Sequence, residues 1–189
     1  MKPSSLGIFL SFAPFIVFFV LASIVSPLAG LACGLILSVG LAILDRQHGK
    51  SFKILTIGSI VLFAVTIMLV ALAPDLSADV IRLIVNGGLT FIAFMSLAIG
   101  RPFTLQYARE QLPEQYWNEP LFIRTNQLIT AVWILAFALG TAAAAGSIYA
   151  PSVSGWFDVA VTVTGLVFAV WFTGWYPARV RGAVSAELL

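Results

Sequence analysis

Long apolar stretches separated by short polar breaks fill the chain from one end to the other. Six stretches can be distinguished, at about residues 7–25, 27–44, 54–73, 79–99, 127–149 and 154–176. Each is close to the roughly 20 apolar residues with which a helix crosses a bilayer. The pattern therefore predicts an all-α, polytopic membrane helical bundle of six transmembrane helices, forming a single domain over residues 1–189.

The breaks between the stretches carry residues that start and end helices. Pro27 suits the first turn of the second helix, and Ser77 is a candidate N-cap for the fourth. The longest break, residues 100–126, contains three prolines, which prevent one continuous helix. We expect it to be an interfacial loop, with a short helix within residues 102–112.

Composition and charge place the chain in a membrane and orient it. The sequence is 60% hydrophobic and 10% charged, against about 45–50% and about 25% for soluble domains. If six spans leave both termini in the cytoplasm, nine of the ten basic residues lie inside and Arg82 alone lies outside. This asymmetry is the positive-inside pattern. A five-span alternative would require one segment to lie flat and would break the charge separation.

The polar loop between the fourth and fifth spans is the first candidate site. Aromatic side chains are enriched at headgroup depth, and arginines at the inner face contact anionic phospholipid. The loop is therefore predicted to be an interfacial anchor, with a specific lipid or partner site as the alternative. The candidate lipid or partner contacts are Arg101, Phe103, Tyr107, Arg109, Trp117 and Arg124.

Small residues recur every four positions in the second and fifth spans. Such stripes let helix backbones approach closely in lipid, where burial alone does not drive association. We expect these two helices to form the centre of the bundle. The bulky faces are expected to meet lipid or a partner, among them Phe15, Phe18 and Phe19 in the first span and Phe168, Trp171 and Phe172 in the last. The predicted packing residues are Gly30, Gly34, Ser38, Gly140 and Ala144.

Three polar residues, Arg82, Asn86 and Asp158, form a possible intramembrane polar site. Arg82 and Asp79 are three positions apart and can pair on one helix face, which favours a structural ion pair over an ion relay. Asn86 precedes two glycines, and this favours helix packing or a kink. A half-broken helix lining a substrate site is the alternative.

The residue inventory gives little support to catalysis. Cys33 and His48 are the single cysteine and histidine, so the usual zinc sites cannot form. A serine triad would need a histidine with partners, and no phosphate-binding loop is found. The basic residues follow the membrane surface and form no nucleic-acid patch. We therefore expect no catalytic residue, no cofactor and no metal.

Scattered motifs resemble a known family in the same order along the chain. They are FAPFIVFF at 12–19, the basic loop DRQHGKSFK at 45–53, GRPF at 100–103, Pro113, Trp117, Asn126 and the run Ala131, Val132, Trp133. The chain resembles the intracellular septation protein A family. That resemblance implies a small multi-pass protein of the bacterial inner membrane, linked to cell-envelope upkeep and septation, with no catalytic residues to carry over.

The sequence therefore favours a non-enzymatic accessory or scaffold protein. Its expected partners are the lipid bilayer, other membrane proteins or a second copy of the chain, and no nucleic acid. A small transporter or channel for an unknown solute is the alternative, and an enzyme acting on lipid is less favoured. A transporter would be expected to show paired discontinuous helices, whereas a scaffold would show outward aromatic faces.

Overall fold

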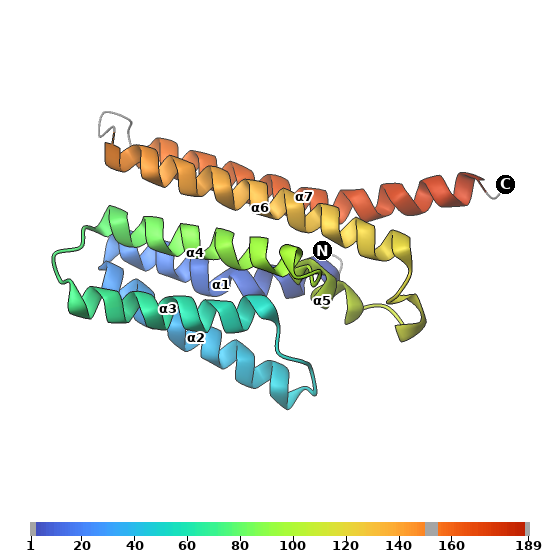
Figure 1. Cartoon of the computed structure of the whole chain (residues 1–189), viewed down its shortest axis with the longest axis horizontal. Coiled ribbons are helices and arrows are strands. Elements are labelled where there is room, and N and C mark those ends of the chain that lie inside the picture. Colours follow the sequence, from blue (N-terminus) through green and yellow to red (C-terminus); the bar gives the residue numbers. More distant parts are fainter. Residues whose placement is uncertain (1–2, 150–154, 188–189) are drawn as a thin grey trace.

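The computed structural model describes residues 3–149 and 155–187. In this part of the chain, helices joined by loops and turns are the only secondary-structure elements (Figure 1). Seven α-helices and one short 3-10 helix follow one another. They are α1 (Pro3–Ile24), α2 (Pro27–Gln47), α3 (Ile54–Leu72), α4 (Ala78–Ala98), α5 (Phe103–Arg109), η1 (Glu114–Tyr116), α6 (Pro120–Tyr149) and α7 (Gly155–Glu187).

Among the described residues, five helices are long and apolar enough to cross a membrane: α2, α3, α4, α6 and the segment Ala160–Val180 of α7. The chain thus has the make-up of a multi-pass membrane protein. The first predicted span, residues 7–25, is not confirmed: α1 covers it, but among the residues with described side chains its apolar part is Leu10–Ile24, shorter than the other candidate spans. The last two helices are longer than predicted, since α6 already begins at Pro120 and α7 continues to Glu187.

Local sequence signals account for several helix boundaries. The Ser26 hydroxyl accepts a hydrogen bond from the Ala29 N–H at 3.2 Å, and the Ser77 hydroxyl accepts one from the Val80 N–H at 3.3 Å. These bonds satisfy N–H groups that the first turn of a helix leaves free. Gly100 follows α4 with φ of 72°, a conformation that glycine adopts without steric cost.

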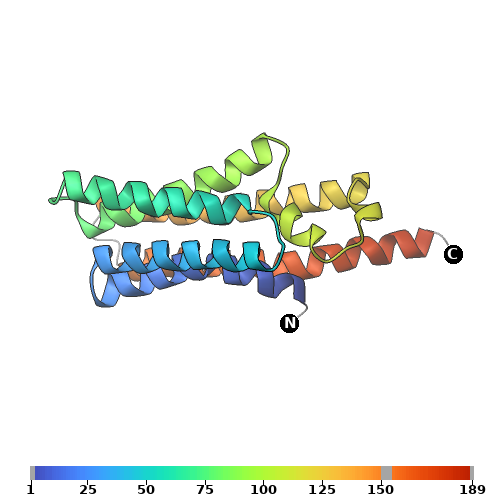
Figure 2. The same ribbon diagram turned by 90° about the horizontal axis from the view of Figure 1, so that it is seen from below.

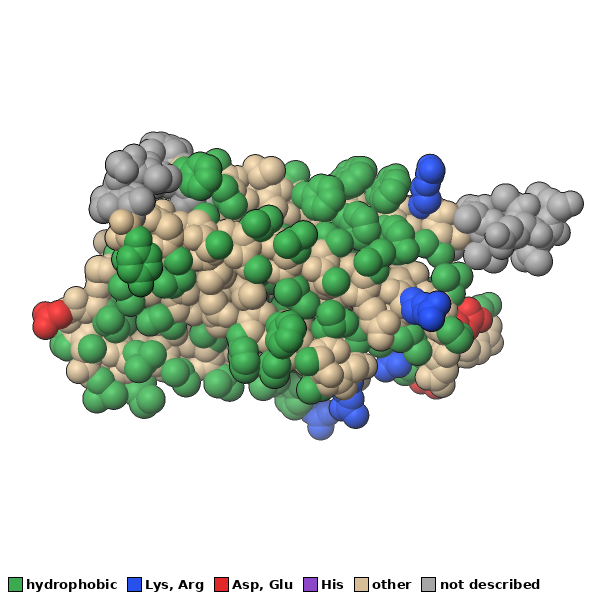
Figure 3. All heavy atoms as spheres, turned by 45° about the horizontal axis from the view of Figure 1, so that its top comes forward, with side chains coloured by type: hydrophobic (Ala, Val, Ile, Leu, Met, Phe, Trp, Pro, Cys, Tyr) green, Lys and Arg blue, Asp and Glu red, His purple; other side chains and the backbone are tan. Residues whose placement is uncertain are grey.

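The long helices pack against one another in chain order. Helix α1 packs on α2, α2 on α3, and α3 on α4. Helix α4 then packs on α6, and α6 on α7. Figures 1 and 2 show the α2–α3 loop, α5, the start of α1 and the end of α7 at the same end of the bundle. We call this the α5 end. Hydrophobic side chains cover the middle of the face in Figure 3, and lysines and arginines gather towards one end.

Aromatic side chains from α1 fill the interior. Phe15 and Phe18 are buried, so the prediction that they meet lipid is wrong. The Phe12 ring stacks on Trp133 of α6 at 4.6 Å between centroids, and the Phe15 ring lies 5.2 Å from that of Phe63 in α3. Because the rings of α1 meet rings from both sides, this helix directs its bulky face inwards.

The small residues of α2 lie at close helix contacts. A Cβ on Gly30 would come within 2.7 Å of the Phe18 carbonyl oxygen, and one on Gly34 within 2.8 Å of the Phe63 ring. Ser38 is buried on the same face. However, α2 packs mainly against α1 and α3, whereas α6 packs mainly against α4 and α7. The prediction that α2 and α6 together form the centre is therefore wrong.

Candidate functional site

The short helix α5 closes the α5 end of the bundle. The Phe103 N–H donates to the Ser96 hydroxyl of α4 at 3.1 Å. The Thr104 hydroxyl bonds to α6 at two points, the Asn126 carbonyl oxygen at 2.9 Å and the Thr130 hydroxyl at 2.7 Å. These bonds tie α5 to both neighbouring helices and satisfy polar groups that burial would otherwise penalise.

Two aromatic residues of α5 lie inside the protein. Phe103 and Tyr107 have exposed fractions of 0% and 1%, so the prediction that their side chains contact lipid or a partner is wrong. The Phe103 ring contacts those of Phe12 and Trp133 edge to face, at 6.1 and 6.3 Å. Aromatic pairs favour this geometry. The rings are buried because the core continues to the α5 end and leaves room for them.

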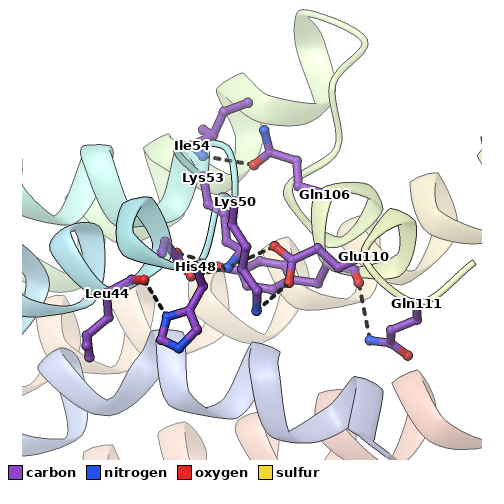
Figure 4. A network of polar contacts seen from close by, with 10 residues as sticks. Leu44, His48, Lys50, Lys53, Ile54, Gln106, Glu110 and Gln111 are labelled. Carbon is purple, nitrogen blue, oxygen red and sulfur yellow. Dashed lines mark hydrogen bonds and ion pairs between the residues drawn. The ribbon is translucent and has the colours of Figure 1, made fainter.

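A compact ionic network lies next to Tyr107. It consists of Asp45, Lys50, Lys53 and Glu110, which we call the Lys53 cluster (Figure 4). The Lys53 ammonium lies 2.9 Å from both Asp45 carboxylate oxygens and 3.0 Å from Glu110. Lys50 lies 3.1 Å from Glu110. With two bases and two acids, the cluster is neutral overall.

Lys53 is buried, with an exposed fraction of 5%, and contacts an aromatic ring as well as two carboxylates. Its ammonium lies 5.0 Å from the centre of the Tyr107 ring, within the range of a cation–π contact. A buried charge is tolerated when paired and hydrogen-bonded. The arrangement therefore holds the lysine in place as a structural group joining α5 to the α2–α3 loop.

The Tyr107 phenol is held in its neutral form. Burial raises the pKa of this group above its usual value, and the nearby carboxylates of Asp45 and Glu110 add to the effect. The nearby hydroxyls of Ser11 and Thr56 act in the opposite direction and are outweighed. A phenol with a raised pKa is a poor proton donor near neutral pH, so Tyr107 is suited to packing.

A backbone bond completes the connection between α5 and α3. The Gln106 side-chain oxygen accepts a hydrogen bond from the Ile54 N–H at 2.8 Å, at the first residue of α3 (Figure 4). Sequence reasoning found neither Gln106 nor the Lys53 cluster. One signal was present, because Lys53 directly precedes an apolar span and needs a partner at that depth.

Of the remaining predicted loop residues, Arg109 and Trp117 contact each other, whereas Arg101 and Arg124 are exposed. The Arg109 guanidinium lies 5.5 Å from the Trp117 ring and contacts the Trp117 carbonyl oxygen at 3.4 Å. The Trp117 indole N–H in turn donates to the Leu112 carbonyl oxygen at 2.9 Å. Arg101 and Arg124 are exposed. Of the three arginines predicted to contact lipid or a partner, Arg101 and Arg124 are therefore the two with exposed side chains.

Of the predicted intramembrane polar residues, Arg82 and Asn86 lie one turn apart on α4, and Asp158 lies on α7. Arg82 donates to Asp79 at 3.4 Å and to the Ser23 hydroxyl of α1 at 3.2 Å, at the end opposite α5. Because Asp79 is exposed, the ion pair contributes little. Asp158 lies in α7, but its side chain is outside the described residues.

Asn86 lies within a continuous helix. Since α4 runs unbroken from Ala78 to Ala98, the alternative of a half-broken helix at this point is wrong. A Cβ on Gly88 would collide with the Leu62 side chain of α3, so this glycine allows close packing of α3 on α4. The Asn86 side chain, with an exposed fraction of 7%, lines an apolar pocket between helices.

The predicted packing residues of α6 face neighbouring helices. Gly140 and Ala144 are both buried. A Cβ on Gly140 would lie 3.0 Å from the Thr162 hydroxyl oxygen of α7. Nearby, the Trp133 indole N–H donates to the Thr173 hydroxyl of α7 at 2.9 Å. The small residues and this hydrogen bond together fix α7 on α6.

Metal-binding and nucleophilic groups do not converge in the described part of the chain. Over residues 3–149 and 155–187, no three His, Cys, Asp or Glu side chains are grouped as metal ligands. His48 is exposed, with its Nδ1 2.7 Å from the Leu44 carbonyl oxygen of its own helix. Cys33 is half-buried in α2. Neither residue is placed next to a catalytic partner.

Comparison of the chain with family models, with curated proteins and with solved structures finds no significant match in any of the three.

Proposed function

We propose that this chain is a non-enzymatic accessory protein of the bacterial inner membrane, which acts by binding other membrane proteins of the cell envelope. The resemblance to the intracellular septation protein A family supports this assignment. In the proposed orientation the α5 end, with both termini, faces the cytoplasm, as the distribution of basic residues favours. The observation that carries the proposal is an aromatic row on α7.

The aromatic row lies on the exposed face of α7. Phe168, Trp171 and Trp175 have exposed fractions of 50%, 53% and 41%. Trp171 and Trp175 stack at 5.2 Å with an angle of 15° between ring planes, and Phe168 lies 5.7 Å from Trp171. Each ring is thus braced by the next before any partner binds.

Braced aromatic rings are better suited to a protein partner than to lipid alone. A flexible aliphatic side chain contacts lipid tails at no cost in free energy compared with a protein neighbour, since the tails are equally apolar. Tryptophan is enriched among the residues that dominate binding, and rings already held in place lose little entropy on contact. The partner that fits this surface is a transmembrane helix whose small residues admit the rings.

The test compares two variants that remove the same kind of side chain from different faces. The first is Trp171→Leu with Trp175→Leu on α7, and the control is Phe91→Leu with Phe94→Leu, at two exposed positions of α4. Each tagged protein is extracted from its native membrane in mild detergent. We expect one protein to be recovered in stoichiometric amount with the wild type and the α4 variant, and to be lost from the α7 variant.

Two results would contradict the proposal. Recovery of the wild type with lipid alone would favour transport, and flux measurements in liposomes would follow. Retention of the partner by the α7 variant would place the binding surface elsewhere. The unbroken α4 gives the transporter alternative no support of its own.

Anionic phospholipid is the second proposed partner, at the α5 end. Arg101 and Arg124 are exposed there, while Arg109 is engaged with Trp117. Juxtamembrane basic side chains contribute about 1 kcal/mol each towards an anionic surface. Neutralising Arg101 and Arg124 together should therefore reduce the anionic lipid retained in native mass spectra, whereas neutralising Arg109 should change it less.

A further inference from the structure

A pocket within the membrane-spanning part of the bundle contains an amide with no partner. It lies between α1, α4, α6 and α7 and has a volume of about 60 Å³. Its walls are mostly apolar, and the aromatic side chains among them include Phe12, Phe15, Trp133 and Phe137. Asn86 lines the pocket and is 7% exposed. Among the residues that the structure describes, none forms a hydrogen bond with the Asn86 side chain.

An unpaired buried amide is costly in this environment. Leaving a buried polar group without a hydrogen bond costs about 1–3 kcal/mol in proteins. Other polar groups on the same helices have found partners, as Thr90 of α4 bonds to Thr141 of α6 at 2.9 Å. Asn86, one turn away from Thr90, lines the pocket, and no described residue is hydrogen-bonded to its side chain. The pocket is therefore suited to a molecule that supplies the missing partner.

Depth and access define the class of molecule. Asn86 lies eight residues into α4, roughly 12 Å from its start, and so near the middle of a 30 Å hydrocarbon layer. Ile16, whose exposed fraction is 39%, belongs to the lining, so the pocket reaches the surface that lipid covers. Among the residues whose side chains the structure describes, none that lines it is charged. A ligand would therefore be neutral, enter from the lipid and carry its polar group far from any headgroup.

The volume restricts the shape of that molecule. A water-sized sphere requires about 10–15 Å³, so about 60 Å³ accommodates a short run of chain atoms and no large ring system. We propose that this pocket binds a neutral, chain-like lipid bearing one hydroxyl or carbonyl oxygen, which bonds to the Asn86 amide while its chain lies against the aromatic walls.

The test uses 1-hexadecanol carrying a photoreactive diazirine on its chain. The full-length protein is reconstituted in liposomes and labelled, and the labelled residues are identified by mass spectrometry. We expect labelling of α1 between Phe12 and Phe19 and of α6 between Trp133 and Gly140, which line the pocket. Excess unlabelled 1-hexadecanol should compete better than hexadecane by roughly 3- to 10-fold, the range of a single hydrogen bond in a membrane.

Two variants distinguish the contribution of the Asn86 hydrogen bond from that of the apolar pocket walls. Asn86→Leu should remove the preference for the alcohol over the hydrocarbon while leaving chain labelling in place. Thr90→Val, on the same helix but outside the lining, should retain that preference. The comparison in the wild type needs no variant, so it stays decisive even if Asn86→Leu does not fold.

Three outcomes would overturn the proposal. One is equal competition by the alcohol and the hydrocarbon in the wild type. Another is labelling confined to lipid-facing positions such as Phe91. The third is an unchanged preference in a folded Asn86→Leu protein, which would assign the hydrogen bond to a different group.

Discussion

Many hydroxyl side chains in the long helices are satisfied within their own helix. Ser38 donates to the Gly34 carbonyl oxygen at 2.8 Å, Ser59 to that of Leu55 at 2.7 Å and Thr66 to that of Leu62 at 2.7 Å. Such bonds let a hydroxyl be buried without a partner on the next helix. Contacts among α1, α2 and α3 consequently depend on shape, and small residues decide how closely these helices approach.

Two glycines of α2 provide a matched test of this dependence on shape. Gly30→Ala should lower the free energy of unfolding by about 1–3 kcal/mol, because the added methyl meets the Phe18 carbonyl oxygen of α1. Gly40→Ala should leave stability unchanged or raise it by up to about 1 kcal/mol, since no atom lies within 4 Å of the new Cβ. Equilibrium unfolding in mixed micelles with increasing dodecyl sulfate measures both. Equal effects would mean that Gly30 is not a packing residue.

The two lysines of the Lys53 cluster differ mainly in burial, and that difference predicts different costs. Lys53→Met should lower the free energy of unfolding by about 1.5–3 kcal/mol, because Asp45 and Glu110 lose their shared donor. Lys50→Met should cost no more than about 1 kcal/mol, since the Lys50 side chain is 45% exposed. The same unfolding measurement separates them. A Lys53→Met protein as stable as the wild type would show the cluster to be dispensable.

At the scale of the element, α5 shows where sequence reasoning succeeds and where it stops. Gly100 and Pro102 identify a helix end and a new start, and the expected short helix within residues 102–112 is present as Phe103–Arg109. Its burial could not be foreseen. Seven residues are too few for an apolar face to be distinguished from an interfacial one, and the space they occupy is defined by α4 and α6.

The same limitation applies to the candidate site. Arg101 and Arg124 were predicted as surface groups and are exposed. The Lys53 cluster joins residues far apart in the chain, and spacing within one helix gives no indication of that pairing. In α1, the aromatic spacing was visible, but whether that face met lipid or protein depended on rings from α3 and α6.

Burial of α5 can be tested with a pair of leucine-to-cysteine changes. In a Cys33→Ala background, Leu105→Cys should react with a maleimide at least about tenfold more slowly than Leu112→Cys, because a buried thiol reacts only after local opening. Leu105 is buried in α5, whereas Leu112 lies in the following loop and is exposed. The purified protein in mild detergent is used. Equal reaction rates at the two positions would mean that α5 is exposed at the protein surface.

At the scale of the whole molecule, the alternating directions of the long helices place the loops at two ends. The sequence predicted the succession of long helices well, because apolar length is a property of a whole segment that tolerates local error. The orientation, argued from basic residues, stays a prediction. Helix neighbours were predicted less well. Packing order depends on which surfaces fit, and the small-residue stripes of α2 and α6 contact different partners.

Topology is testable from outside the cell. In a Cys33→Ala background, Asp75→Cys in the α3–α4 turn should react with an impermeant maleimide on intact cells. Ser51→Cys in the α2–α3 loop should react only after permeabilisation, and an N-terminal epitope tag should likewise be inaccessible until then. The tag decides whether α1 crosses the membrane. Detection of the tag on intact cells would reduce the spans to five.

Helix α6 bonds through side chains to three of its neighbours. Thr141 bonds to Thr90 of α4, Thr130 to Thr104 of α5, and Trp133 to Thr173 of α7. A ribosome makes α6 after α1 to α5, and 51 positions separate Thr90 from Thr141. At about 5–20 residues per second, α4 waits roughly 3–10 s for this partner. The first four helices are therefore made before the bond that ties α4 to α6 can form, and the bond between Trp133 and Thr173 forms later still, once α7 has been made.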